Sequence, residues 1–110
     1  MKKIDSIPRC PIHETVKFLA GAWTLEIYWN LRDQSLRFGE LRRKLGTVSP
    51  KVLTQRLREL EDLGVLHREV LDTSPPQVEY SLTASGRLFI PIIDAIAEVG
   101  QKLVRKSKRK

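Results

Sequence analysis

The sequence predicts a mainly helical α+β fold, a winged helix-turn-helix with an additional helix at each end of the chain. Three observations predict it. Residues 46–64 form a tight glycine-bearing turn followed by a stretch with clear start, face and stop signals of a helix. The next residues change to the two-residue period of strands, and residues 83–104 return to a helical period.

The first predicted helix begins at Cys10-Pro11, because proline suits the first helical position, and it ends at Gly21. Ile12 and Val16 lie on its apolar side. A second, strongly apolar helix is predicted over residues 23–31. Both tryptophans of the chain are interpreted as core residues, since no cluster of acidic or basic side chains surrounds them.

A short extended piece at residues 36–38 precedes a third helix, predicted over residues 39–45. The turn at residues 46–48 leads into the next helix. Ser49 can cap that helix with its side-chain oxygen, and Pro50 occupies the first helical position, where its missing N–H costs nothing. The two helices and their turn therefore predict a helix-turn-helix.

The helix predicted over residues 49–63 has two unlike faces. Leucines at 3.6-residue spacing form a buried face: Leu53, Leu57, Leu60 and Leu63. The opposite face carries Lys51, Thr54, Gln55 and Arg58, which suit phosphate and base-edge contacts. Basic residues precede acidic ones, the reverse of what the helix dipole favours. Local pairs, Arg56–Glu59 and Arg58–Asp62, are the alternative explanation, but they leave Lys51, Thr54 and Gln55 without partners.

A hairpin is predicted after this helix. Residues 78–82 alternate between apolar and polar side chains, and residues 65–71 are rich in β-forming residues. The connection at residues 72–77 contains two prolines and is too long for a two-residue turn. A hairpin with an extended tip directly after the second helix of a helix-turn-helix is a wing.

Thr83 is expected to cap the last helix, which continues through residue 104, and Pro91 should kink it or delay its start. The apolar stripe of this helix is wider than a small domain can bury, so a partner subunit is expected to cover the rest. The residues expected at that dimer interface are Ile12, Val16, Phe89, Ile93, Ile96 and Val99. Residues 105–110 form a basic tail, interpreted as a frayed, solvated end, with non-specific phosphate contact as the alternative.

The composition predicts one globular domain over residues 9–104, preceded by an N-terminal arm at residues 1–8. The chain has 110 residues, of which 41% are hydrophobic and 30% charged, and its net charge is +7. Residues 37–58 contain seven basic side chains and one acidic one, whereas residues 59–101 are net acidic. This separation of charge is typical of a surface that attracts an anionic partner.

Several classes of function are disfavoured. A single cysteine excludes an intrachain disulfide, and the chain has no secretion signal and no apolar run that could span a membrane, so a cytoplasmic protein is expected. His13 and His67 have no metal-ligand spacing, and there is no glycine-rich phosphate loop. We therefore expect no catalytic residues, no metal and no cofactor.

With these motifs in place, the chain closely resembles the HxlR-type family of bacterial winged helix-turn-helix regulators. The resemblance covers about residues 9–104 and rests on motifs in one order: Cys10-Pro11, Trp23-Thr24, R-F-G-E-L-R at 37–42, S-P-K-V-L-T-Q-R-L-R-E-L-E at 49–61 and V-E-Y-S-L-T at 78–83. The family usually has a lysine before the tryptophan, where this chain has Ala22.

The resemblance implies a DNA-binding transcriptional regulator that binds a palindromic operator as a homodimer held by its first and last helices. It makes residues 49–63 the recognition helix and residues 72–77 the wing. The residues expected to contact double-stranded DNA are Arg42, Arg43, Ser49, Lys51, Thr54, Gln55, Arg58 and Gln77. Gln55 and Arg58 are expected to read base edges, while arginine and lysine side chains around them hold phosphates. The alternative is a winged-helix protein-interaction module without specific DNA binding.

Cys10 is the candidate for sensing an oxidant or a small-molecule effector. It lies at the start of the first predicted helix, where backbone amides and the helix dipole favour a thiolate. The resemblance supports the same role, since several regulators of this type sense electrophiles or oxidants through a cysteine at this place. The alternative is that Cys10 only packs.

Overall fold

The computed structural model describes residues 10–108, with side chains described for residues 10–106, so the predicted N-terminal arm and the end of the basic tail lie outside the described residues. The elements in chain order are α1 (Pro11–Val16), α2 (Thr24–Leu31), β1 (Leu36–Arg37), α3 (Phe38–Leu45), α4 (Pro50–Asp62), β2 (Leu66–Leu71), β3 (Gln77–Leu82), α5 (Ala84–Arg87) and α6 (Ile90–Lys108). The predicted fold class, a mainly helical winged helix-turn-helix, is confirmed.

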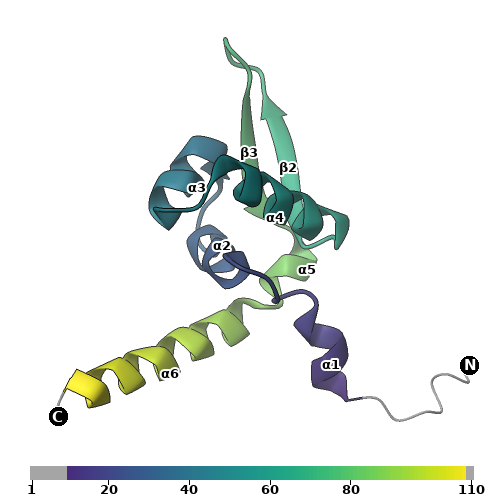
Figure 1. The fold of residues 1–110 in the computed structure, drawn as a ribbon. Helices are drawn as coiled ribbons and strands as arrows, with labels where there is room; N and C mark the ends of the chain where they lie inside the picture. The colour runs from purple at the N-terminus through teal and green to yellow at the C-terminus, as the bar shows by residue number, and fades with distance from the viewer. Residues whose placement is uncertain (1–9, 109–110) are drawn as a thin grey trace, which may run out of the picture.

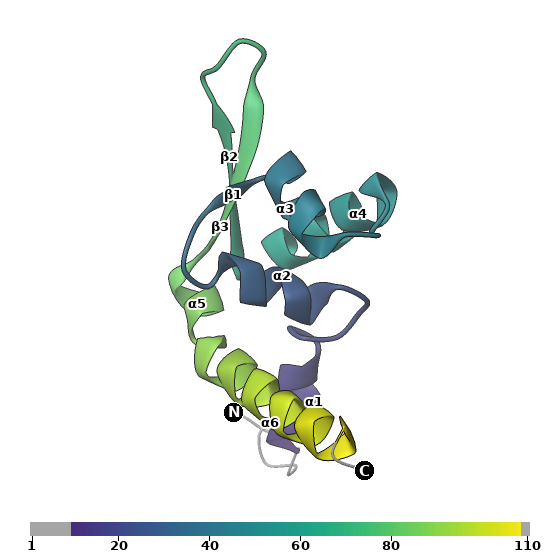
Figure 2. The ribbon, with the colours of Figure 1, turned by 90° about the vertical axis from the view of Figure 1, so that its left-hand side faces the viewer.

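Helices α2, α3 and α4 form a central body from which the hairpin and the terminal helices project in opposite directions. Figure 1 shows the β2–β3 hairpin rising from one end of the body, while α1 and α6 diverge at the other. The view turned by 90° shows the same separation (Figure 2). The C-terminal end of α6, which carries the basic tail, therefore lies far from the wing.

Local signals define α4 at both ends, as predicted. The Ser49 hydroxyl accepts a hydrogen bond from the Val52 amide at 3.1 Å, and Pro50 is the first helical residue. Gly64 follows the helix with φ +81°, a left-handed conformation that glycine adopts without strain. The next amide, that of Val65, donates to the carbonyl of Leu60 at 3.2 Å and completes the C-terminal cap.

The hydrophobic core lies where the three central helices meet the base of the sheet. Its most buried members are Ile27, Tyr28, Leu31, Leu41, Val48, Leu53, Leu57 and Val65. The Tyr28 hydroxyl donates to the carbonyl oxygen of Phe18 at 2.9 Å and so connects α2 to the segment after α1. Burial raises the pKa of Tyr28 to about 12, so this phenol remains a hydrogen-bond donor throughout the physiological pH range.

The three strands form an antiparallel sheet in the order β1-β3-β2. The extended piece predicted before α3 is β1, and its Leu36 pairs with Tyr80 of β3. The hairpin is in register from Leu66 opposite Leu82 to Leu71 opposite Gln77. Residues 72–76 connect the two strands and form the tip of the wing.

Two expectations about the first two helices are wrong. Helix α1 ends at Val16 and continues only as turns, so it does not reach Gly21. Trp29 is 44% exposed, because the buried side of the short helix α2 is filled by other side chains. The guanidinium carbon of Arg32 lies 5.2 Å from the Trp29 ring centroid and covers part of the ring. The other tryptophan, Trp23, is partly buried against the core, as expected.

The C-terminal segment contains two helices instead of the single one predicted. Thr83 caps the short helix α5, and its hydroxyl accepts a hydrogen bond from the Gly86 amide at 3.1 Å. Helix α6 begins separately at Ile90, directly before Pro91, which confirms that this proline delays the helix start. Residues 105–108 are helical, so the expectation that the chain frays from residue 105 is wrong.

Candidate nucleic-acid interface

The exposed face of α4 brings together most of the polar residues predicted to contact DNA. Lys51, Gln55 and Arg58 are exposed and Thr54 is half-buried. Together with neighbouring polar side chains of the same helix, they line a shallow groove of about 550 Å³. Ser49 lies at the start of this face, but its hydroxyl oxygen already serves the helix cap.

Gln55 has a hydrogen-bond partner within α4, whereas the sequence predicted that it has none. Its amide nitrogen donates to Glu59 Oε2 at 3.4 Å, while Glu59 Oε1 accepts from Arg56 Nη1 at 2.6 Å. The first bond is long and exposed, and is therefore weak enough for a DNA base to replace it. The predicted pairing of Arg56 with Glu59 is confirmed.

Arg56 faces the body of the protein and not the exposed face of α4. Its Nε donates to the carbonyl oxygen of Ala22 at 2.9 Å, which connects α4 to the loop between α1 and α2. A Cβ atom at Gly21 would lie 3.1 Å from the same Nε, so the arginine packs closely over this loop. The position of Arg56 in the first part of α4 therefore has a structural reason. The order of basic before acidic residues in this helix is for that reason not due to DNA binding alone.

A second groove lies between the start of α3 and the wing. It has a volume of about 530 Å³, and Arg43 of α3 and Gln77 of β3 both line it. Arg37, which the sequence motifs did not indicate as a DNA contact, lines it too. The Glu40 carboxylate accepts a hydrogen bond from the Arg37 amide at 2.8 Å and fixes the helix start. Gln77 thus lies beside Arg43 and not on the face of α4.

Arg42 lies at the turn of the helix-turn-helix. Its Nε donates to the carbonyl oxygen of Val48 at 3.3 Å, across the turn between α3 and α4. The residue remains exposed. Arg42 therefore helps to hold the turn while its guanidinium remains accessible to a phosphate.

Arg68 is a further basic residue of this surface, and it was not among the DNA contacts expected from sequence. Arg68 and Tyr80 of the wing, with Thr54, Arg58 and Glu61 of α4, line a cleft of about 350 Å³. The two-residue period of the strand could have predicted its place, because it puts Arg68 on the same side of β2 as the buried Leu66.

Apolar side chains are also exposed on both terminal helices. They include Ile12 and Val16 of α1 and Ile92, Ile96, Val99 and Leu103 of α6, with exposures between 38% and 69%. On α6 they line an apolar groove of about 660 Å³ that also includes Pro91, Ala95 and Gly100. This helix runs away from the body of its own chain (Figure 1), which leaves the groove open.

Two of the six residues expected at a dimer interface belong to the core of the chain itself. Ile93 is only 4% exposed, and Phe89 packs its ring against Phe18 and Tyr28 at centroid distances of 5.4 and 5.6 Å. These two side chains lie on the inner side of the C-terminal segment, where it approaches α2. The apolar stripe of this segment is thus shared between the core and the open face.

Cys10 is exposed and unpaired, at the N-cap position of α1. Its side chain makes no capping hydrogen bond, so the sulfur is accessible to a reagent. The described part of the chain has no cluster of His, Cys, Asp and Glu side chains that could hold a metal ion. It also has no helix long and apolar enough to cross a membrane.

Comparison with known proteins gives a consistent result. The sequence model of the HxlR-like helix-turn-helix family matches residues 18–108. An HTH-type transcriptional regulator of Methanothermobacter thermautotrophicus is 40% identical over 92 residues, which cover 84% of this chain and 70% of that protein. The HTH-type transcriptional regulator YdeP of Bacillus subtilis is 40% identical over 98 residues, covering 89% and 77%. The redox regulator HypR in its oxidised form has a TM-score of 0.80 at 40% identity, covering 84% of this chain and 96% of the HypR chain.

Proposed function

The chain belongs to the HxlR-like helix-turn-helix family of transcriptional regulators, which are not enzymes, and we propose that it binds a palindromic operator as a homodimer. The observation that carries the proposal is the exposed polar face of α4, capped at Ser49 and followed by a wing. Such a helix enters the major groove with its N-terminal part toward the bases. Arg42, Arg43 and Lys51 surround it with positive charge.

The apolar groove of α6 supports the homodimer. Single exposed apolar side chains are normal on a monomeric protein. A continuous apolar groove on a chain of 110 residues is instead typical of a protein–protein interface. A second copy would cover the groove with its own α6, and the exposed Ile12 and Val16 of α1 would add to the interface. In a two-fold dimer the two recognition helices would meet successive major grooves, about 34–36 Å apart.

A first prediction separates base reading from phosphate binding. Gln55→Ala should weaken operator binding by about 1–3 kcal/mol and relax sequence preference, because the amide of glutamine can pair with adenine in the major groove. Arg58→Ala should do the same. Arg43→Ala should instead weaken binding to all duplexes alike and reduce the salt dependence. Fluorescence anisotropy on operator and scrambled duplexes over a range of salt concentrations measures both effects.

Wild-type affinity on both duplexes is the reference, and thermal unfolding checks that each variant remains folded. The assignment would be wrong if Arg43→Ala changed sequence preference while Gln55→Ala and Arg58→Ala did not. A wild-type chain whose affinity for duplex DNA was negligible and independent of salt would instead favour a protein-interaction module.

We further propose that Cys10 makes operator binding responsive to an oxidant. The exposed, unpaired thiol and the 40% identity to HypR, a redox regulator with an oxidised form, support this proposal. A reagent such as diamide can take two electrons and two protons from a pair of thiols. The product would be a disulfide between the Cys10 residues of two subunits, or a mixed disulfide with a small thiol. Alkylation by a quinone would modify a single Cys10.

Any of these products would act through α1. The Tyr28–Phe18 hydrogen bond and the Arg56–Ala22 hydrogen bond connect the segment after α1 to α2 and to the recognition helix. A displacement of α1 can therefore change the spacing or the orientation of the two recognition helices.

A second prediction tests this role. Diamide, hypochlorite or a quinone should change operator affinity by at least about fivefold in the wild type, a coupling of about 1 kcal/mol, and not in Cys10→Ser. Mass spectrometry under non-reducing conditions identifies the product, and a thiol reductant should restore affinity after diamide. Equal responses of both proteins, or no response in either, would leave Cys10 without a sensing role.

A further inference from the structure

The cleft between the recognition helix and the wing contains an arginine from each element. Within the hairpin, Arg68 of β2 lies opposite Tyr80 of β3. Two pairs closer to the body, Leu66 lies opposite Leu82, and both leucines are buried in the core. Since side chains two residues apart share a face, Arg68 extends this inner face of the hairpin beyond the edge of the core. Beyond Arg68 on this face, Val70 lies opposite Val78, so Arg68 is the charged side chain of an inner face that is otherwise apolar or aromatic.

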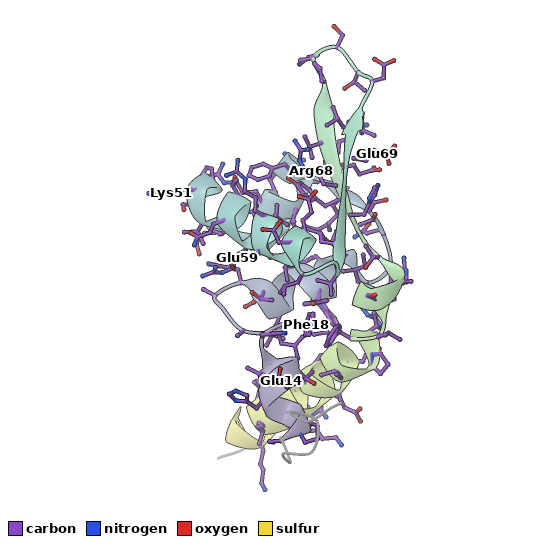
Figure 3. The ribbon with its side chains drawn as sticks, turned by 90° about the vertical axis from the view of Figure 1, so that its right-hand side faces the viewer. Glu14, Phe18, Lys51, Glu59, Arg68 and Glu69 are labelled. Atoms are coloured by element: carbon purple, nitrogen blue, oxygen red, sulfur yellow. The ribbon has the colours of Figure 1, made fainter. Side chains whose placement is uncertain are left out.

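Figure 3 shows the same arrangement. Arg68 lies on the side of the hairpin that faces α4, whereas Glu69, the next residue, lies on the opposite side. Across the cleft, Thr54 and Arg58 are four residues apart and therefore occupy the same side of α4. Lys51 lies toward the far end of that helix (Figure 3), away from the wing.

The charge in this cleft is not neutralised. Two guanidinium groups and one carboxylate, that of Glu61, line it. Among the described residues, neither Arg58 nor Arg68 forms an ion pair or a side-chain hydrogen bond. By contrast, Arg56 of the same helix and Arg32 of the body both have carboxylate partners. The cleft therefore has a net positive charge and free hydrogen-bond donors.

We propose that Arg68 binds a backbone phosphate of operator DNA in this cleft, at the point where one DNA strand passes between the major and the minor groove. A recognition helix in the major groove and a wing over the neighbouring minor groove leave this strand between them. A guanidinium group can bind a phosphate with two parallel hydrogen bonds. Arg58 adds positive potential to the cleft while its side chain reaches the bases. This inference rests on the proposed DNA-binding function.

The experiment combines a protein variant with a modified duplex. Methylphosphonate linkages, which carry no charge, replace one phosphate at a time, at the equivalent position in both half-sites. A methylphosphonate at one position, at the boundary between the major and minor grooves, should reduce the affinity of the wild type about tenfold. In Arg68→Ala, affinity for the unmodified duplex should already be about tenfold lower, and the same methylphosphonate should cause no further loss.

The salt dependence and a matched control complete the test. Arg68→Ala should lower the slope of log affinity against log salt by about 0.9 per subunit, on operator and scrambled duplexes alike. Glu69→Ala, which removes a charge from the other side of the same strand, should retain the methylphosphonate effect. Thermal unfolding of Arg68→Ala should match that of the wild type, because this side chain is exposed.

Three results would overturn the inference. Arg68→Ala could bind as tightly as the wild type, it could change sequence preference, or it could retain the full sensitivity to methylphosphonate at every position. If these results occurred while the wild type still bound its operator, the DNA-binding function would stand and only the role of Arg68 would be wrong. A wild-type chain that bound no duplex would overturn both.

Discussion

Ile96→Glu is expected to separate the subunits of the proposed homodimer and lower operator affinity by a factor of about 10²–10⁴, because a monomer loses the second half-site. Ile96 lies in the middle of the apolar groove of α6, where it is 45% exposed. A carboxylate at this position would have to be buried against apolar side chains of the second copy, at a large cost in desolvation. Analytical ultracentrifugation at micromolar concentration and anisotropy measurements on the operator follow the two effects.

The core residue Ile93 supplies the matched control. It is one helical turn from Ile96 but only 4% exposed within its own chain, so Ile93→Glu should unfold the protein. Ile96→Glu should remain folded, as judged by its far-ultraviolet circular dichroism. A wild-type protein that sediments as a monomer would contradict the dimer. An Ile96→Glu variant that remained dimeric and bound its operator normally would exclude this groove as the interface.

Gly86→Ala should lower the free energy of unfolding by about 3 kcal/mol, through a steric clash in a tightly packed region. A Cβ atom at Gly86 would lie 2.2 Å from the carbonyl oxygen of Val65. This oxygen belongs to the backbone and already accepts a hydrogen bond from the Thr83 amide at 3.1 Å, so it cannot rotate away. Helix α5 would have to separate from the start of β2, and urea denaturation would show a lower midpoint.

Gly39→Ala is the control for this change. Gly39 is also helical, but the nearest atom to its added Cβ would be the flexible end of Arg43 at 3.7 Å. Alanine should therefore raise the free energy of unfolding by about 0.5–1 kcal/mol, through its better helix propensity. Equal effects of the two substitutions would contradict the role of Gly86 as a contact point.

The region around Gly86 also connects α6, the proposed dimer helix, to α4. The Thr83 hydroxyl donates to the carbonyl oxygen of Gly64 at 2.7 Å, directly after α4, while it accepts from the Gly86 amide in α5. Arg32 at the end of α2 donates to Asp94 of α6 at 2.7 Å. These contacts fix the direction of α6 relative to α4. The proposed dimer would therefore hold its two recognition helices at a defined spacing.

The recognition helix and the wing were readable from sequence because their signals are local. The capping serine, the proline, the terminal glycine and the leucine period of α4 all lie within residues 49–64, and each depends on backbone geometry a few residues away. The period of two in residues 78–82 likewise needed no distant partner. The residues of the polar face of α4 could be predicted for the same reason.

The partners and orientations of the remaining side chains were decided by contacts between segments far apart in the chain. Arg56 meets Ala22 across 34 positions, and β1 becomes a strand only because β3 pairs with it. Ile93 and Ile96 belong to one apolar stripe, yet only the packing of α6 against α2 assigns one to the core and the other to the open face. Arg68 likewise belongs to the candidate site because the wing packs beside α4. A sequence period shows which residues share a side of an element, but what that side contacts depends on how the elements pack.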